Sequence, residues 1–191
     1  TRYWRDWSSD VCSSDLKGIF IESDIVSCDG LITNTKNVAL ITFYADCVPV
    51  FLFDPEVKVI GLAHSGWKGT LHQISAKAVN VMVERFNCKP ENIVSAIGPS
   101  IGVCCFEVGN EVKDQFINKI SWSKNFCIKK DEEKSYIDLQ GIVKQTLINS
   151  GLKNENIFIS NICTKCNKDM FFSHRGDMGK TGSLAAIMQL K

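Results

Sequence analysis

The chain has 191 residues, with 22 basic and 21 acidic side chains, a formal net charge of +1 and 45% hydrophobic residues. This length and composition predict one folded domain that buries a core without help from disulfides. The near-zero net charge argues against a nucleic-acid partner, because binding to a phosphate backbone needs a surplus of cations. No apolar run is long enough for a bilayer and no stretch has the pattern of a secretory leader, so we expect no membrane partner and a cytoplasmic location.

Nine cysteines are spread along the chain. In a short secreted protein they would indicate a disulfide framework, but the count here is odd and the chain is long. We therefore expect reduced thiols.

The N-terminal segment differs from the rest of the chain. Residues 1–16 repeat Ser-Ser-Asp and follow neither the strand nor the helix period. Residues 6–16 resemble the translation of a sequencing-library adapter. We predict that 1–16 is non-native and that 17–191 is the domain, lacking its native N-terminal part; the alternative is a genuine polar arm.

The first predicted elements are β-rich runs at 38–44, 48–53 and 57–63. The Asp54-Pro55-Glu56 connection between the last two predicts an antiparallel hairpin. Apolar residues at helical spacing predict a helix from Thr70; they are Leu71, Ile74, Ala78, Val81, Met82 and Phe86.

Further along the chain, strands are predicted at 92–97 and 157–162 and helices at 108–120 and 139–150. The charged segment 124–134 is interpreted as a solvated loop. Periodicity leaves 183–190 open between helix and strand, and we favour strand. Hairpin-joined strands mixed with helices predict an α+β fold with a mixed sheet.

Cys47 and His64 occupy the open ends of the predicted hairpin strands. If the strands pair, the thiol and the imidazole meet, which suits zinc or copper ligation and equally suits a thiolate activated by histidine. A third reading is that both residues only fill the core.

The glycine-rich turn after the third strand contains Gly66, Trp67, Lys68 and Gly69. Free backbone N–H groups and a cation at a helix start favour an anion such as phosphate. The alternative is a purely steric role for the glycines and a packing role for the tryptophan.

Cys163 and Cys166 form a Cys-x-x-Cys pair, half of a zinc ribbon. The other half would have to come from the adjacent Cys104 and Cys105, which we expect to chelate one ion poorly, so a structural zinc site is not predicted there. A thioredoxin-like motif is not predicted either, because a polar loop follows.

Near the C-terminus, His174, Arg175 and Asp177 offer a base, an anion clamp and a carboxylate. The alternative is a set of loop salt bridges. His72, next to Gln73, is interpreted as facing solvent.

Three blocks of sequence, at 43–74, 96–109 and 161–182, resemble the laccase-domain family, the YfiH-type group once called multicopper polyphenol oxidases, and residues 29–34 also fit. The resemblance implies a single α+β domain with a mixed-sheet sandwich and a zinc site of one cysteine and two histidines. It also implies phosphorolysis of adenosine, inosine and 5′-methylthioadenosine, with adenosine deamination alongside. The implied partners are a purine nucleoside and phosphate, and the protein would be a monomer or homodimer.

For this sequence, the resemblance implies that Cys47 and His64 are metal ligands and catalytic residues. The implied cofactor is zinc, with copper as the alternative. The third ligand, a histidine expected upstream of Asp29, is missing, because no histidine precedes His64. The site is therefore expected to be incomplete. Lys68, Gly176 and Ser183 stand where the family usually has arginine, which weakens the expected phosphate affinity.

The remaining roles are assigned on the same hypothesis. The residues expected to bind phosphate or stack the base are Gly66, Trp67, Lys68, Gly69, Phe172 and Arg175. His174 and Asp177 are the candidates for proton transfer.

Two other enzyme classes stay open. One is a cysteine hydrolase with Cys47 as nucleophile and His64 as base. The other is a copper-dependent polyphenol oxidase, although such enzymes need many histidines and this chain has 3. A non-enzymatic fragment is a further alternative.

Overall fold

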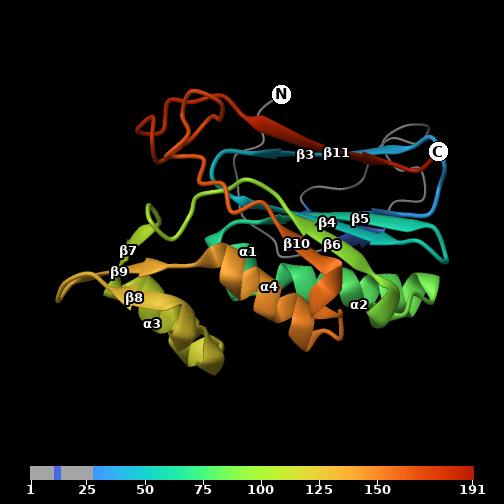
Figure 1. The fold of residues 1–191 in the computed structure, drawn as a ribbon, viewed down its shortest axis with the longest axis horizontal. Helices are drawn as coiled ribbons and strands as arrows, with labels where there is room; N and C mark the ends of the chain where they lie inside the picture. Colours follow the sequence, from blue (N-terminus) through green and yellow to red (C-terminus); the bar gives the residue numbers. More distant parts are fainter. Residues whose placement is uncertain (1–10, 14–27) are drawn as a thin grey trace.

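The computed structural model describes residues 11–13 and 28–191 and has three layers (Figure 1). The central layer is a six-stranded sheet in the order β1 (Val11–Ser13), β2 (Gly30–Thr33), β5 (Val59–Ser65), β4 (Val48–Asp54), β6 (Val94–Ile97) and β10 (Ile157–Ile159). The antiparallel pair β3 (Ala39–Tyr44) and β11 (Leu184–Gln189) covers one face. The other face is covered by α1 (Trp67–Leu71), α2 (Ile74–Phe86) and α4 (Leu139–Asn149).

A smaller unit lies at one end of these layers (Figure 1). It consists of a three-stranded sheet of β7 (Glu107–Gly109), β9 (Lys134–Ile137) and β8 (Cys127–Lys129), with α3 (Asn110–Lys119) beside it. Short 3-10 turns complete the chain at η1 (Pro90–Asn92), η2 (Ser121–Phe126) and η3 (Asn154–Asn156). The central sheet is mixed, since β1–β2 and β10–β6 are parallel and its other pairs antiparallel. The predicted α+β fold is confirmed.

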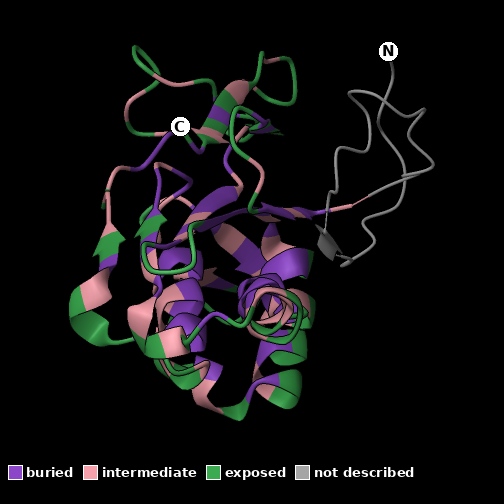
Figure 2. Ribbon diagram, turned by 90° about the vertical axis from the view of Figure 1, so that its right-hand side faces the viewer, coloured by how far each residue is buried: buried purple, intermediate pink, exposed green. Residues whose placement is uncertain are grey.

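Two apolar cores separate the layers. The larger lies between the central sheet and the helices, where Leu52, Ile74 and Met82 are fully buried. The smaller lies between the sheet and the β3–β11 pair and is centred on Leu62. Burial on both faces explains why β5 is apolar at nearly every position rather than alternating, and Figure 2 shows the buried positions gathered in these layers.

The predicted hairpin is formed by β4 and β5, with Val48 opposite Ser65 and Pro49 opposite His64. At its closed end, the Asp54 carboxylate accepts hydrogen bonds from the backbone N–H groups of Glu56 and Val57, at 2.9 and 3.1 Å. Such Asp-centred turns supply the hydrogen bonds that a reversing chain loses. The hairpin therefore places the residues at its open end side by side.

Three predictions need correction. The helix expected from Thr70 onward is two helices, because Gln73 adopts a left-handed conformation with φ of 54° and ends the first one. The expected loop 124–134 is exposed but contains β8, which pairs with β9. The expected helix 108–120 begins at Asn110, since the residues before it form β7.

Of the N-terminal segment set apart in the sequence, the structure describes only Val11–Ser13, which pairs as β1 with β2. The other residues of 1–16 lie outside the described part, so the non-native origin of this segment stays a prediction. None of the helices among residues 28–191 combines the length and the hydropathy needed to cross a bilayer.

Candidate active site

The open end of the β4–β5 hairpin brings Cys47 and His64 together. Cys47 directly precedes β4 and His64 is the penultimate residue of β5, so the strand register makes them neighbours. The thiol lies within hydrogen-bonding reach of the imidazole. Both are partly buried, so the two groups share a site that solvent reaches.

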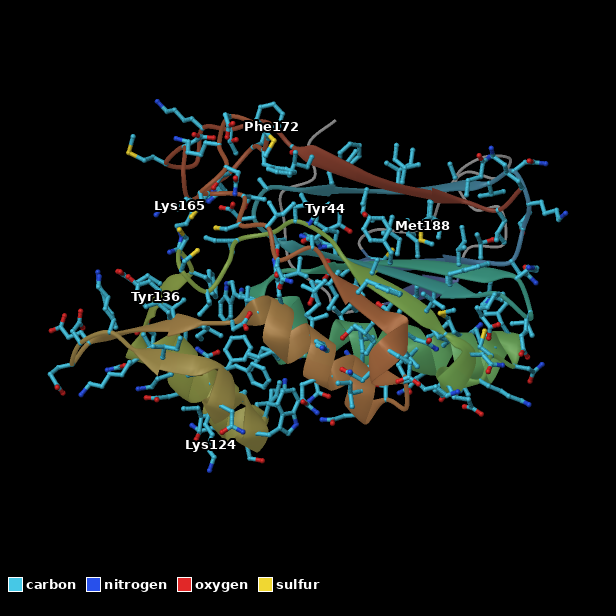
Figure 3. All side chains as sticks on the ribbon, in the orientation of Figure 1. Tyr44, Lys124, Tyr136, Lys165, Phe172 and Met188 are labelled. Carbon is cyan, nitrogen blue, oxygen red and sulfur yellow. The ribbon has the colours of Figure 1, made fainter. Side chains whose placement is uncertain are left out.

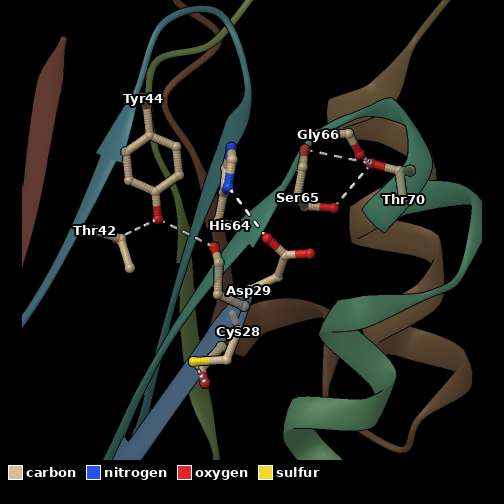
Figure 4. Close-up of polar contacts among 10 residues, drawn as sticks. Cys28, Asp29, Thr42, Tyr44, His64, Ser65, Gly66 and Thr70 are labelled. Carbon is tan, nitrogen blue, oxygen red and sulfur yellow. Dashed lines mark hydrogen bonds and ion pairs between the residues drawn. The ribbon is translucent and has the colours of Figure 1, made fainter. Parts of the chain in front are cut away.

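Asp29 is the second partner of His64 (Figure 4). Its Oδ1 lies 3.5 Å from His64 Nδ1, and its backbone oxygen accepts a hydrogen bond from the His64 N–H at 2.7 Å. Burial disfavours the charged imidazolium, but the hydrogen bonds to Asp29 and Cys47 outweigh it and raise the pKa of His64 from 6.5 to about 9. With Nδ1 engaged by the carboxylate, Nε2 is the ring atom through which His64 would bind a metal.

Tyr44 forms the wall behind the imidazole. Its ring meets that of His64 edge to face at 5.0 Å, and its hydroxyl donates to the Ala63 oxygen at 3.3 Å. The hydroxyl also lies 2.6 Å from Thr42 Oγ1. Burial raises the pKa of the Tyr44 phenol, so this residue acts as a neutral hydrogen-bonding wall.

Asp46 fastens two loops beside Cys47. Its carboxylate accepts hydrogen bonds from Thr164 Oγ1 at 2.6 Å and from the Arg175 backbone N–H at 2.7 Å. Its backbone oxygen accepts from the Ile101 N–H at 2.8 Å. The side chain is buried, and its contacts hold the loop before β11 against the hairpin.

A cavity of about 250 Å³ is lined by residues of α1, β7 and α3 and by Arg175, and neither Cys47 nor His64 is among its lining residues. Trp67 and Arg175 line it together with Phe106. The Arg175 guanidinium stacks 5.4 Å over the Phe106 ring and donates to the Glu107 backbone oxygen at 2.7 Å. That contact uses one of five guanidinium donors, so Arg175 keeps donors for an anionic ligand.

The glycine-rich turn is positioned by packing and by hydrogen bonds. A Cβ on Gly69 would lie 3.2 Å from the His64 oxygen, so the glycine lets α1 approach β5 closely. Thr70 Oγ1 donates to the Gly66 oxygen at 2.9 Å and lies 2.8 Å from Ser65 Oγ. Lys68 is exposed, with Nζ 5.7 Å over the Trp67 ring. Close packing against β5 therefore accounts for Gly69, whereas the Lys68 side chain is open to solvent.

The other predicted residues lie on the loop before β11. His174 is exposed and Phe172 is 50% exposed, and Figure 3 shows Phe172 projecting at the edge of this loop. Asp177 pairs with Lys168 at 2.8 Å, and this contact lowers the pKa of Asp177. Asp177 thus forms a loop salt bridge, as the alternative interpretation expected. Of His174, Arg175, Asp177 and Phe172, only Arg175 lines the cavity described above.

Three residues of this site were not singled out by sequence reasoning. Asp29, Tyr44 and Asp46 fall only within longer segments of the sequence, namely the family-like blocks 29–34 and 43–74 and the strand predicted at 38–44. Asp29 directly precedes β2, which pairs with β5 and so brings the carboxylate to His64. This position could have indicated the contact only if the pairing of β2 with β5 were already known.

The corner fits a metal ion only in part. Cys47 and His64 are the soft ligands that zinc accepts, whereas catalytic zinc sites use three protein ligands and a water. Among the described residues, the Cys47–His64 corner does not provide three converging ligand atoms. The incompleteness of this metal site stays a prediction.

Four cysteines do converge elsewhere, contrary to the sequence-based expectation. The ligand atoms of Cys104, Cys105, Cys163 and Cys166 all lie within 4.8 Å of one another. The expectation failed because the Cys104-Cys105 pair lies in a tight turn, in which the Cys105 N–H donates to the Gly102 oxygen at 2.9 Å. This cluster could hold a metal ion.

Comparisons with known proteins place the chain in a family. A family model described as "Multi-copper polyphenol oxidoreductase laccase" matches residues 7–191. Purine nucleoside phosphorylase YlmD from Bacillus subtilis is 38% identical over 164 residues, which cover 85% of this chain and 59% of the relative. Adenosine deaminase RL5 from an unknown prokaryotic organism is 34% identical over 156 residues, covering 81% of this chain and 59% of the relative.

The fold is shared as well. The crystal structure of the Bacillus licheniformis hypothetical protein YfiH matches with a TM-score of 0.84 and 37% identity, covering 86% of this chain and 62% of that one. The chain thus spans 59 to 62% of the length of these three proteins. The extent of the family match and the shared fold together show that this chain belongs to the multi-copper polyphenol oxidoreductase laccase family, the YfiH-type group.

Proposed function

We propose that the domain formed by this chain cleaves purine nucleosides with phosphate, taking adenosine, inosine and 5′-methylthioadenosine. The proposal rests on two observations: Cys47 pairs with His64, and a cavity is lined by an aromatic residue, Trp67, three positions after His64, and by a cation, Arg175, whose backbone is held by Asp46. The name of the B. subtilis relative supports the reaction class.

In this reaction phosphate attacks the sugar directly, so the protein need not form a covalent intermediate. A phosphate oxygen attacks C1′ while the C1′–N9 bond breaks, so the products are the purine base and the sugar 1-phosphate, which is ribose 1-phosphate from adenosine or inosine and 5-methylthioribose 1-phosphate from 5′-methylthioadenosine. The transition state resembles an oxocarbenium ion, as in glycoside cleavage. The protein must therefore hold phosphate against the sugar and exclude water.

Arg175 and Lys68 are the proposed phosphate ligands. Arg175 is fixed by stacking on Phe106 and by its backbone hydrogen bond to Asp46, so its remaining donors are pre-oriented. Trp67 stacks the purine, since its ring lines the cavity whereas Phe172 is half exposed at the rim. Stacking on a fixed aromatic ring orients a base without specifying it.

Proton transfer to the leaving purine is assigned to His174, which lies on the same loop as Arg175. Asp177 becomes a positioning residue, because its carboxylate holds Lys168 within this loop. Cys47 and His64 are the residues that would hold a zinc ion, and the ion would supply a Lewis acid. Adenosine deamination, in which water replaces the C6 amino group and ammonia leaves, is proposed as a second reaction on the basis of the deaminase relative.

The test is to incubate the chain with inosine, with and without phosphate, and to measure hypoxanthine and ribose 1-phosphate. We expect hypoxanthine release that depends on phosphate, with equal amounts of both products. Equal rates without phosphate, or ribose in place of its phosphate, would contradict a phosphorylase. With adenosine, formation of inosine reports the deaminase reaction separately.

A cysteine hydrolase is the second candidate. Asp29, His64 and Cys47 follow one another in the order of a carboxylate, imidazole and thiol triad. In this reading, alkylation of Cys47 in metal-free protein would abolish an amidase or esterase activity, and added zinc would not be needed for it.

A further inference from the structure

Four thiols from two distant segments meet at one point in the structure. Cys104 and Cys105 lie in the loop between β6 and β7, and Cys163 and Cys166 lie in the loop after β10. Cys166 Sγ is 3.6 Å from Cys104 Sγ and 3.5 Å from Cys105 Sγ. All four cysteines are free thiols.

These separations match a metal shell and not a disulfide. A disulfide holds its sulfurs about 2.05 Å apart. Four thiolates at about 2.3 Å from a tetrahedral zinc ion lie about 3.8 Å from one another. The distances around Cys166 are close to the second value, so modest outward movement of the sulfurs would admit the ion.

The cluster also has the surroundings of a thiolate site. The Gly102 backbone N–H donates to Cys163 Sγ at 3.2 Å, and such N–H donors stabilise sulfur that carries negative charge. A Cβ on Gly102 would lie 3.1 Å from Cys163 Cβ and 3.3 Å from Cys104 Sγ, so the glycine allows the two loops to pack this closely.

The two loops are held in place independently of any ion. Ser100 and Cys163 form an isolated parallel β-bridge. The Ser100 N–H donates to the Ile162 oxygen at 3.3 Å, and the Thr164 N–H donates to the Ser100 oxygen at 3.0 Å. The scaffold therefore presents preorganised ligands, which lowers the cost of closing the shell.

We propose that Cys104, Cys105, Cys163 and Cys166 bind one zinc ion as a structural site separate from the Cys47–His64 corner. Four S–H bonds give way to four S–Zn bonds, the protons pass to solvent, and no group is oxidised. Four protein thiolates leave no open position for substrate, which is the arrangement of structural zinc.

The ion would join the loop that carries Arg175 to the loop that carries Phe106. These two side chains already stack on one another at the cavity. Lys165, labelled in Figure 3, lies in the chain between Cys163 and Cys166. A cation at this point partly offsets the net negative charge of a zinc ion with four thiolates.

The test is metal analysis of the untagged 191-residue chain, purified in a thiol reductant without chelator. We expect about one zinc per chain in Cys47→Ala, which removes a ligand of the Cys47–His64 corner, and a loss of roughly tenfold or more when Cys166→Ser is added to that variant. Cys127→Ser is the matched control and keeps its zinc, because Cys127 Sγ bonds to the Ser123 oxygen outside the cluster. Zinc absent from Cys47→Ala, zinc retained after Cys166→Ser is added to Cys47→Ala, or another metal in its place would overturn the proposal.

A second measurement uses only the wild type, so that misfolding of a variant cannot decide the outcome. Thiol alkylation is mapped by peptide mass spectrometry before and after removal of metal by a chelator. We expect the four cluster cysteines to gain label on chelation, while Cys127 labels equally in both states. Unchanged labelling of the cluster, or disulfides among its cysteines, would contradict the zinc site.

Discussion

At the scale of single residues, the site depends on how Asp29 and Cys47 act on His64. Burial alone would make the imidazole neutral, and the two neighbours reverse this by stabilising its charged form. Protonated His64 is poised to interact with anions, whereas metal binding requires the neutral ring. His64 is therefore expected to be protonated in the metal-free chain and neutral when a metal is bound.

Replacing Asp29 by Asn removes the carboxylate beside His64 Nδ1 while keeping its size. We expect the pKa of His64 in metal-free protein to fall from about 9 toward 6.5. An NMR titration of the imidazole protons measures this directly. Asp177→Asn, in the loop before β11, is the control and should leave the His64 titration unchanged; a pKa near 9 in Asp29→Asn would contradict the assigned cause.

The same shift predicts how stability depends on pH. The pKa of His64 is higher in the folded state, so the contribution is fully present below about 6.5 and is lost as pH rises through about 9. We expect the free energy of unfolding of metal-free protein to fall by an amount on the order of 1–3 kcal/mol across this window. Urea titrations across the window measure it, and an equally steep fall in Asp29→Asn would show that another group is responsible.

Thr164 tests the attachment of the loop to Asp46. Thr164→Val removes the hydroxyl that donates to the buried Asp46 carboxylate at 2.6 Å. Leaving a buried acceptor without its donor costs about 1–3 kcal/mol, measured as the change in the free energy of unfolding. Thr164→Ser keeps the hydroxyl and serves as the control; equal losses in both variants would show that packing of the methyl group dominates.

At the scale of elements, α4 offers the plainest test of local structure. Asp138 caps this helix, its Oδ1 accepting from the Gly141 N–H at 2.9 Å. Asp138→Ala should lower the free energy of unfolding by about 1 kcal/mol, whereas Asp138→Asn should keep most of the cap. Urea unfolding compares the two, and an unaffected Asp138→Ala would refute a stabilising role for this cap.

The strands that build the site could be predicted from sequence because they are apolar and bounded by turn residues. The hairpin of β4 and β5 follows from the Asp54-Pro55-Glu56 turn, and with it the meeting of Cys47 and His64. The break at Gln73 could not be predicted, since apolar spacing continues across it from Leu71 to Ile74. Likewise, β7 and β8 are three residues long and hold together through pairing with β9.

Contacts between loops could not be predicted from the sequence either, because their residues lie far apart in the chain. The four-cysteine cluster joins positions more than fifty residues apart, as the separation of 62 between Cys104 and Cys166 shows. Asp46 reaches Arg175 across a separation of 129 residues. Local patterns carry no information on which loops meet at one end of a sheet, so these partners emerge only from the packed layers.

At the scale of the whole molecule, three layers place every proposed functional group at one end of the structure. The hairpin supplies Cys47 and His64, α1 supplies Trp67 and Lys68, and the loop before β11 supplies Arg175. Because the central sheet is covered on both faces (Figure 1), chemistry is confined to its rim. This arrangement accounts for a site built almost entirely from loops and strand ends.

The central claim is that the Cys47–His64 corner is the catalytic centre. The most direct measurement compares phosphate-dependent hypoxanthine release from inosine by the wild type, Cys47→Ser and Cys127→Ser, with folding of each checked by circular dichroism. We predict that Cys47→Ser loses activity by roughly a hundredfold or more, while Cys127→Ser keeps that of the wild type. Wild-type turnover in a folded Cys47→Ser protein would contradict the account.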